Sequence, residues 1–103
     1  MKVYLDDTRQ TPEGWTRTYT VEGTIDYLLT GNVKELSLDN DLGTGFREGY
    51  EVMDWLEQYV YDHPEFPIPK ITIHSMDTTR RAYMLLALQS IKRIRAKQLE
   101  GKQ

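Results

Sequence analysis

Acidic and basic side chains come directly after short, β-prone segments of this 103-residue chain. They are Asp6, Asp7, Asp39, Asp41 and His74. Two carboxylates about 5 Å apart at an effective dielectric near 20 repel each other by roughly 3 kcal/mol. A cluster of acids therefore needs a cation, or one member must be protonated. Mg²⁺ (or Mn²⁺) prefers such oxygen ligands and often binds a substrate phosphate too. The acids thus indicate a divalent cation site, although each Asp alone is also typical of a turn or helix cap.

His74 and two further side chains beside these acids suit phosphate chemistry. Imidazole exchanges protons near neutral pH, so His74 either transfers a proton or is a packed, hydrogen-bonded strand-end residue. Arg9 either binds a phosphate with its planar fork or pairs with the local acids. Ser75 either donates a hydrogen bond to phosphate or caps the last helix. The sequence leaves these alternatives open.

Strands that alternate with helices must bring these residues together. We expect strands at 2–5, 15–20, 35–39 and 70–74, and helices that begin after Thr20, at 49 and after Asp77 or Thr78. This alternation predicts a parallel sheet, at whose carboxyl edge the strand ends converge and ligands bind. Residues 6–15 are too few for a full crossover helix, so the direction of the second strand stays open. The core face of the last helix should include Met84, Leu85, Leu88 and Ile91.

The composition excludes several classes of protein. Without cysteine, the chain has no disulfide, thiolate nucleophile or Cys-ligated zinc site. Acid at positions 6 and 7 comes too early for a signal peptide. No apolar stretch approaches the roughly 20 residues that a membrane span needs. We therefore expect a single cytoplasmic domain over residues 1–103 that does not contact a membrane.

Charge is distributed unevenly along the chain. Residues 1–66 contain 5 Lys and Arg against 14 Asp and Glu, whereas residues 67–103 contain 8 against 2. The acidic part argues against a nucleic-acid partner. The basic end, about residues 92–103, is either a solvated last helical turn, where cations suit the helix dipole, or a contact site for a protein partner.

Five segments together resemble one known family. They are Leu-Asp-Asp-Thr-Arg at 5–9, Pro-Glu-Gly-Trp at 12–15, Leu-Ser-Leu-Asp-Asn-Asp-Leu-Gly at 36–43, Gly-Tyr at 49–50 and Ile-His-Ser at 73–75. The family is that of the cyclic-phosphate-processing receiver domains, divergent relatives of response-regulator receivers. The resemblance spans about residues 2–91. It implies a receiver-like (flavodoxin-like) α/β fold, with about four parallel strands in the order 2-1-3-4 and helices on both faces.

The resemblance also implies roles, and the chain departs from the family pattern. Asp6-Asp7 match the acid pair that binds Mg²⁺, and Asp39 matches the phosphoacceptor. The family pattern usually reads Leu-Asp-His-Asp-Leu-Gly, and this chain has Asn40 where the pattern has His. An Asn side chain can hydrogen-bond to a ligand but cannot shuttle a proton. Asp77 stands where the family has Asn. The Lys that follows a fifth strand in ordinary receivers has no counterpart.

Three functions fit these residues. The first is a metal-dependent phosphoesterase that processes a cyclic-phosphate or other small, phosphate-containing (nucleotide) substrate with Mg²⁺ or Mn²⁺. Its expected metal ligands are Asp6, Asp7 and Asp39, its catalytic residues Asp39, Asp41 and His74, and its phosphate-binding residues Arg9, Ser75 and Asn40. The second is a phosphoacceptor switch at Asp39. The third is a non-enzymatic nucleotide-binding or adaptor domain.

Overall fold

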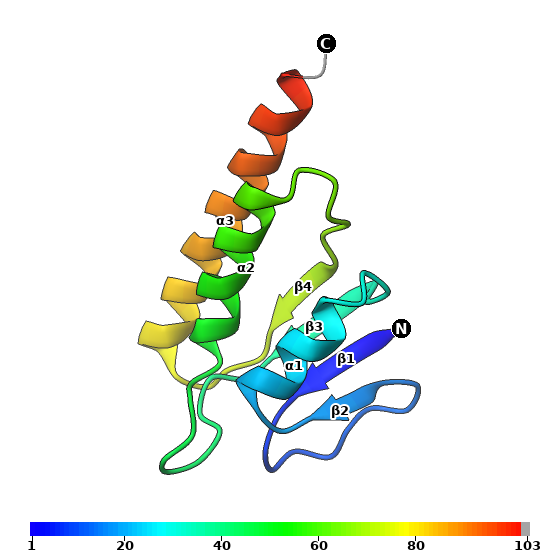
Figure 1. The fold of residues 1–103 in the computed structure, drawn as a ribbon. Coiled ribbons are helices and arrows are strands. Elements are labelled where there is room, and N and C mark those ends of the chain that lie inside the picture. The colour runs from blue at the N-terminus through cyan, green and yellow to red at the C-terminus, as the bar shows by residue number, and fades with distance from the viewer. Residues whose placement is uncertain (102–103) are drawn as a thin grey trace.

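The computed structural model describes residues 1–101, which form one parallel sheet and three helices (Figure 1). The strands are β1 (Lys2–Leu5), β2 (Thr16–Thr18), β3 (Glu35–Leu38) and β4 (Lys70–Ile73). The helices are α1 (Val21–Leu28), α2 (Tyr50–Asp62) and α3 (Thr78–Glu100). All neighbouring strands are parallel, in the order β2-β1-β3-β4. The strand number and order are confirmed, and β2 is parallel to β1 although only a loop joins them.

The helices begin where side chains satisfy their first free N–H groups. The Thr20 hydroxyl accepts a hydrogen bond from the Gly23 amide at 3.1 Å, which caps α1. At α3, a carboxylate oxygen of Asp77 accepts one from the Arg80 amide at 2.9 Å. Thr20 is the cap that the sequence predicted, and of the two residues it left open for the last helix, Asp77 is the cap. They fix the start of each helix relative to the strand ends that precede it.

One face of the sheet carries the hydrophobic core. Side chains alternate between the two faces of a strand, and Val3, Leu36 and Ile71 share one row of the register. Buried residues of this face pack in one cluster with buried residues of all three helices. The opposite face presents Tyr4 and other residues of alternate register, which do not belong to that cluster. The helices therefore cover one face rather than the two expected, because residues 6–15 form a loop where a helix would cover the other.

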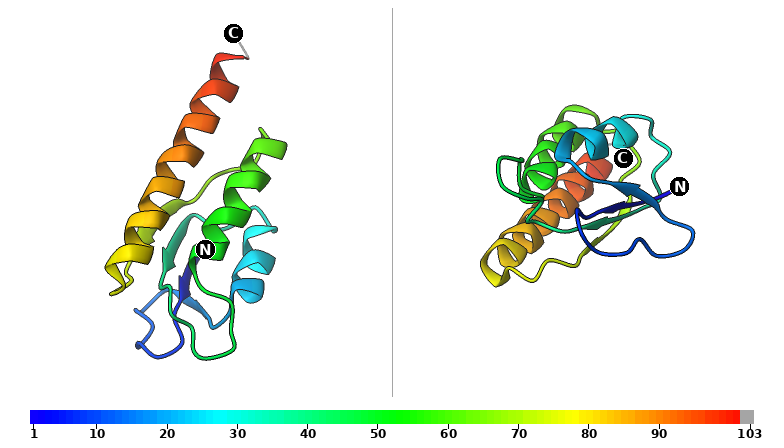
Figure 2. Two further views of the ribbon diagram at one scale, coloured as in Figure 1. Left: turned by 90° about the vertical axis from the view of Figure 1, so that its left-hand side faces the viewer. Right: turned by 90° about the horizontal axis from the view of Figure 1, so that it is seen from below.

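Helices α2 and α3 lie side by side and run in the same direction (Figure 2). Helix α3 is the longer, and its C-terminal part extends beyond the rest of the fold (Figure 1). Met84 and Ile91 are fully buried, but Leu85 is 43% exposed, contrary to expectation. Successive helical residues lie 100° apart, so the narrow stripe of α3 that faces α2 and the core does not include the position next to Met84.

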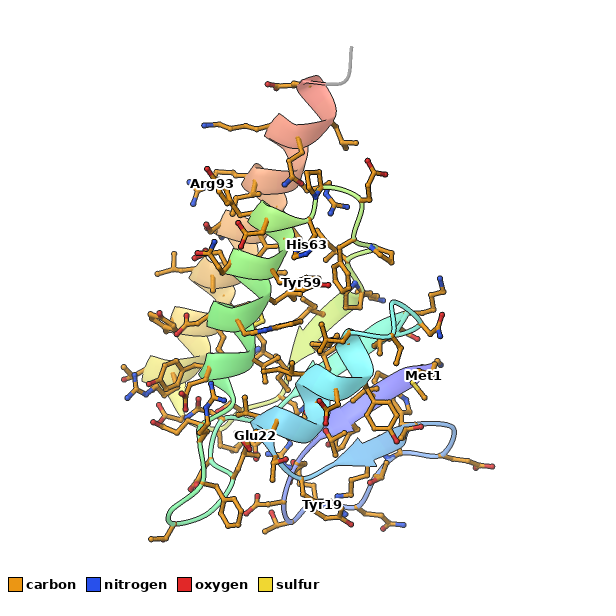
Figure 3. All side chains as sticks on the ribbon, in the orientation of Figure 1. Met1, Tyr19, Glu22, Tyr59, His63 and Arg93 are labelled. Carbon is orange, nitrogen blue, oxygen red and sulfur yellow. The ribbon has the colours of Figure 1, made fainter. Side chains whose placement is uncertain are left out.

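The basic residues near the end of α3 differ in their surroundings: Arg95 contacts another part of the fold, whereas Arg93 is exposed. Arg95 donates a hydrogen bond of 2.6 Å to the Phe66 carbonyl oxygen, which ties α3 to the loop before β4. Arg93 projects away from α2, whereas Tyr59 of α2 stacks on His63, the residue that follows the helix, with 3.9 Å between ring centroids (Figure 3). Lys102 and Gln103 of the expected basic tail lie outside the described residues. None of the described helices is both long and apolar enough to cross a membrane.

Candidate functional site

The strand register brings three of the expected site residues together. Leu5, Leu38 and Ile73 are aligned in the sheet, so the residues that follow them leave its carboxyl edge side by side. These are Asp6, Asp39 and His74, and one nitrogen or oxygen of each lies within 4.8 Å of the others. Three of the five residues expected to converge therefore do so in one cluster, and Asp7 and Asp41 line the pocket described below.

A partly buried chain of hydrogen bonds joins Asp6, His74 and Ser37. His74 Nε2 lies 3.0 Å from Asp6 Oδ2, and His74 Nδ1 lies 2.7 Å from Ser37 Oγ. An ionised carboxylate only accepts hydrogen bonds, so Nε2 carries the proton that it donates to Asp6. In the neutral ring, Nδ1 then accepts from the Ser37 hydroxyl. These two contacts leave neither ring nitrogen free for a ligand, and the imidazole also stacks on Tyr4, with centroids 4.5 Å apart.

Asp6 is held as an ionised, fully buried carboxylate. Its Oδ1 accepts hydrogen bonds of 2.9 Å from the backbone amides of both Thr8 and Arg9. The Arg9 side chain also approaches Oδ2, at 3.8 Å. Burial raises the pKa of Asp6, but the hydrogen bonds from Arg9, Thr8 and His74 outweigh burial and hold the pKa below its usual 3.8. Asp6 therefore anchors the turn after β1 and orients His74.

Asp39 occupies a different environment, although it is close to Asp6. Only one hydrogen bond to its carboxylate is present among the described residues, from the Asn40 amide to Oδ1 at 2.8 Å. Burial, together with the negative charge of Asp6, raises the pKa of Asp39 above its usual value. A cation or a cationic ligand group that neutralises a carboxylate in this environment stabilises its ionised form.

A pocket of about 520 Å³ opens in front of this row. Its lining residues are Asp7, Thr8, Arg9, Asp39, Asp41, Gly43, Ser75, Met76 and Asp77. It therefore includes expected metal-binding, catalytic and phosphate-binding residues from all three strand ends. Asp41 uses Oδ1 to accept a hydrogen bond from the Gly43 amide at 3.1 Å. The buried Ser75 hydroxyl accepts one from the Asp77 amide, also at 3.1 Å, so Ser75 shapes the turn that leads into α3.

Asn40 does not join the expected phosphate-binding residues. Its side chain is buried, and Nδ2 donates to Glu48 at 2.9 Å while Oδ1 accepts from the Tyr50 amide at 3.0 Å. The side chain thus satisfies a free N–H group at the start of α2 and is not among the residues that line the pocket. The role of Asn40 is accordingly corrected from ligand binding to helix capping.

Two features of the site were missed in the sequence. Gly49 approaches the backbone of Asp39 so closely that a Cβ atom there would overlap the Asp39 carbonyl oxygen. Ser37 lies two residues before Asp39, as Tyr4 lies two residues before Asp6, and both support His74. The alternation of strand side chains could have placed Ser37 and Tyr4 on the site's face. Nothing local marked the close contact of Gly49.

The pocket offers the kind of donor atom that a hard divalent cation binds. Asp7, Asp39 and Asp41 supply carboxylate oxygens around one pocket, which is the donor set that Mg²⁺ and Mn²⁺ prefer. Asp6 lies behind them, and its oxygens already accept hydrogen bonds from Thr8, Arg9 and His74. Among the described residues, the three side chains whose ligand atoms lie within 4.8 Å of one another are Asp6, Asp39 and His74, so Asp39 belongs both to that cluster and to the pocket.

The parallel sheet in the order β2-β1-β3-β4, with acids at the carboxyl ends of β1 and β3, defines a receiver-like α/β domain. The sequence model of the cyclic-phosphate processing receiver domain matches residues 1–90, so the chain belongs to this family. No curated protein and no solved structure matches the chain.

Proposed function

We propose that this domain is a metal-dependent phosphoesterase that opens a cyclic phosphate. One observation carries the proposal: Asp7, Asp39, Asp41 and Arg9 converge on a single pocket at the carboxyl edge of the sheet. The family description, cyclic-phosphate processing, supports the choice of substrate. Asp7 and Asp39 would hold Mg²⁺ or Mn²⁺, which supplies Lewis acidity toward a phosphoryl oxygen when bound.

The side chains of the pocket suit the remaining requirements of hydrolysis. In this reaction an oxygen of water bonds to phosphorus, one ester P–O bond breaks, and the leaving oxygen receives a proton. Arg9 is exposed at the pocket and can form two parallel hydrogen bonds to phosphate oxygens. Asp41 Oδ2 has no hydrogen-bond partner among the described residues and can accept a proton from the attacking water.

The structure favours a positioning role for His74. Of the two roles that the sequence leaves open for His74, proton transfer is the less favoured, because its ring nitrogens already contact Asp6 and Ser37 and the ring does not line the pocket. We now assign it to hold Asp6, and through Asp6 the Thr8 and Arg9 amides, in place. Solvent then provides the proton to the leaving oxygen, because the pocket is open to water.

Purified protein with Mg²⁺ or Mn²⁺ and a panel of 2′,3′-cyclic and 3′,5′-cyclic nucleotides tests the proposal. We expect a phosphomonoester product, whose formation Asp7→Asn and Asp39→Asn reduce at least a hundredfold, about 2.7 kcal/mol of transition-state stabilisation. Asp26→Asn, at an exposed position of α1, is the matched control. No turnover across the panel would count decisively against a phosphoesterase.

The same samples separate the two other functions. A mass gain of about 80 Da after acetyl phosphate would indicate a phosphoacceptor switch at Asp39, because one phosphoryl group is added. Stabilisation by nucleotide and Mg²⁺ without any product would indicate a ligand-binding or adaptor domain.

A further inference from the structure

We propose that Phe46 and Met76 bind the base of a nucleotide whose phosphate lies in the pocket described above. The ligand class would then be a nucleotide rather than a phosphate ester without a base. This inference rests on the proposed function, since it needs a phosphate in the same pocket. It adds two residues that select the ligand without taking part in the chemistry.

Both side chains are large, apolar and exposed beside a charged pocket. Met76 is 81% exposed and lines the pocket, and Phe46 is 59% exposed. A Cβ atom on Gly43 would lie 3.6 Å from the Phe46 ring and 3.7 Å from Asp7 Oδ2. Since Gly43 also lines the pocket, the Phe46 ring and the Asp7 carboxylate flank the same point on its wall.

Tyr83, another exposed aromatic side chain, contacts other side chains, whereas Phe46 and Met76 do not pack against the core. Tyr83 packs edge-on against Tyr50 at 5.5 Å and donates a hydrogen bond to Asp54. Among residues 1–101, neither Phe46 nor Met76 belongs to the hydrophobic core or to its partly buried margin. Large apolar side chains at the rim of a pocket commonly contact a ligand.

The pocket is large enough for more than a phosphate. Its volume of about 520 Å³ falls in the range of roughly 300–1,000 Å³ that is typical of sites for small organic ligands. The lining includes the charged side chains of Asp7 and Arg9 and the apolar side chain of Met76, and the Phe46 ring lies next to Gly43 of the lining. A nucleotide has the same division, since its phosphate is charged and its base is a planar ring that stacks on aromatic and thioether side chains.

The base can be tested with two ligands that differ in it alone. Isothermal titration calorimetry in Mg²⁺ compares adenosine 5′-monophosphate with ribose 5-phosphate. We expect the nucleotide to bind at least fivefold more tightly. Phe46→Ala should weaken nucleotide binding about 5- to 50-fold and leave ribose 5-phosphate unchanged, the range expected for loss of one stacking contact. Met76→Ala should act in the same direction but less strongly.

Two control variants make the result specific. Phe46→Tyr keeps an aromatic face and should retain the preference for the nucleotide. Tyr61→Ala removes another exposed aromatic, 66% exposed on α2 and absent from the lining of this pocket, and should change neither affinity. Because Phe46 and Met76 are exposed, their variants should unfold at the same temperature as the wild type.

The outcomes separate a failure of the base contact from a failure of the proposed function. Equal affinities for the two ligands, or a Phe46→Ala variant that binds both as the wild type does, would overturn the base contact while inorganic phosphate still binds. If inorganic phosphate, ribose 5-phosphate and the nucleotide all fail to bind in Mg²⁺, both this inference and the proposed function are wrong.

Discussion

His74 lies between Asp6 and Ser37, and its Nε2 atom is 3.0 Å from Asp6 Oδ2. The contact joins the ends of β1 and β4, which are separated by β3 in the sheet. It therefore spans the width of β3, and Asp39, which follows β3, lies within 4.8 Å of both partners. A histidine that the sequence marks as catalytic is thus part of the framework that positions the acids.

Loss of this contact should destabilise the fold. Asp6→Asn keeps an acceptor for the Thr8 and Arg9 amides but replaces the charged partner of His74 with a neutral one. We expect the free energy of unfolding to fall by about 1–3 kcal/mol, as for other buried hydrogen bonds to a charged group. Urea denaturation measures it. A change no larger than that of Asp26→Asn, which lies on the surface of α1, would contradict the framework role.

The contact between Asp6 and His74 should also make the stability of the fold depend on pH in the acidic range. Folding lowers the pKa of Asp6 below 3.8, so its ionised form contributes stability at pH values above the unfolded pKa. That contribution is lost as the pH falls through the lower, folded value. The difference in Tm between wild type and Asp6→Asn should therefore be constant from pH 7 to 5 and shrink below about pH 4. A difference that grows as the pH falls would reverse the assignment.

Asp39 should behave in the opposite sense. Its pKa is raised in the folded protein, so its ionised form costs stability at neutral pH when no cation is present. Asp39→Asn should raise the Tm of the metal-free protein by about 2–4 °C. It should also abolish stabilisation by Mg²⁺, which for the wild type is about 2.7 kcal/mol at a hundredfold excess over Kd. Thermal unfolding with EDTA and with Mg²⁺ measures both effects.

An unchanged or lower Tm of Asp39→Asn in EDTA would show that burial and the charge of Asp6 do not make the ionised form of Asp39 costly. Retention of the full Mg²⁺ effect in that variant would place the cation away from Asp39. Asp62→Asn, at the exposed C-terminal end of α2, controls for the loss of one negative charge.

Gly49 should tolerate no side chain. A Cβ atom there would overlap the Asp39 carbonyl oxygen, while the Gly49 amide donates to the Asn40 carbonyl at 2.8 Å. Gly49→Ala must therefore move either α2 or the segment that carries Asp39, and we expect a loss of about 2–4 kcal/mol. Gly45→Ala is a useful comparison because nothing lies within 4 Å of its Cβ position, although its φ of +86° adds local strain.

Chemical denaturation of both glycine variants gives the comparison. We expect Gly49→Ala to lose Mg²⁺-dependent stabilisation as well, since Asp39 moves with its backbone. A Gly49→Ala variant as stable as Gly45→Ala would show that the backbone at Asp39 accommodates the methyl group.

Much of the fold could be predicted because its signals are local. Thr20 and Asp77 cap helices through hydrogen bonds to residues three positions ahead, so neighbouring positions in the sequence carry the information. The strand segments and the acids that end them are also local features. Parallel pairing then required Asp6 and Asp39 to meet at one edge of the sheet.

Tertiary structure alone decided which of the site's polar groups remain available to a ligand. Nothing near Asn40 in the sequence shows that its amide satisfies the start of α2, and nothing near His74 shows that Ser37 and Asp6 occupy both ring nitrogens. These partners come from other elements, 37 and 68 residues away in the case of His74. A hydrogen bond consumes a donor or acceptor wherever its partner lies in the chain, so only the folded arrangement shows which groups are still free to react.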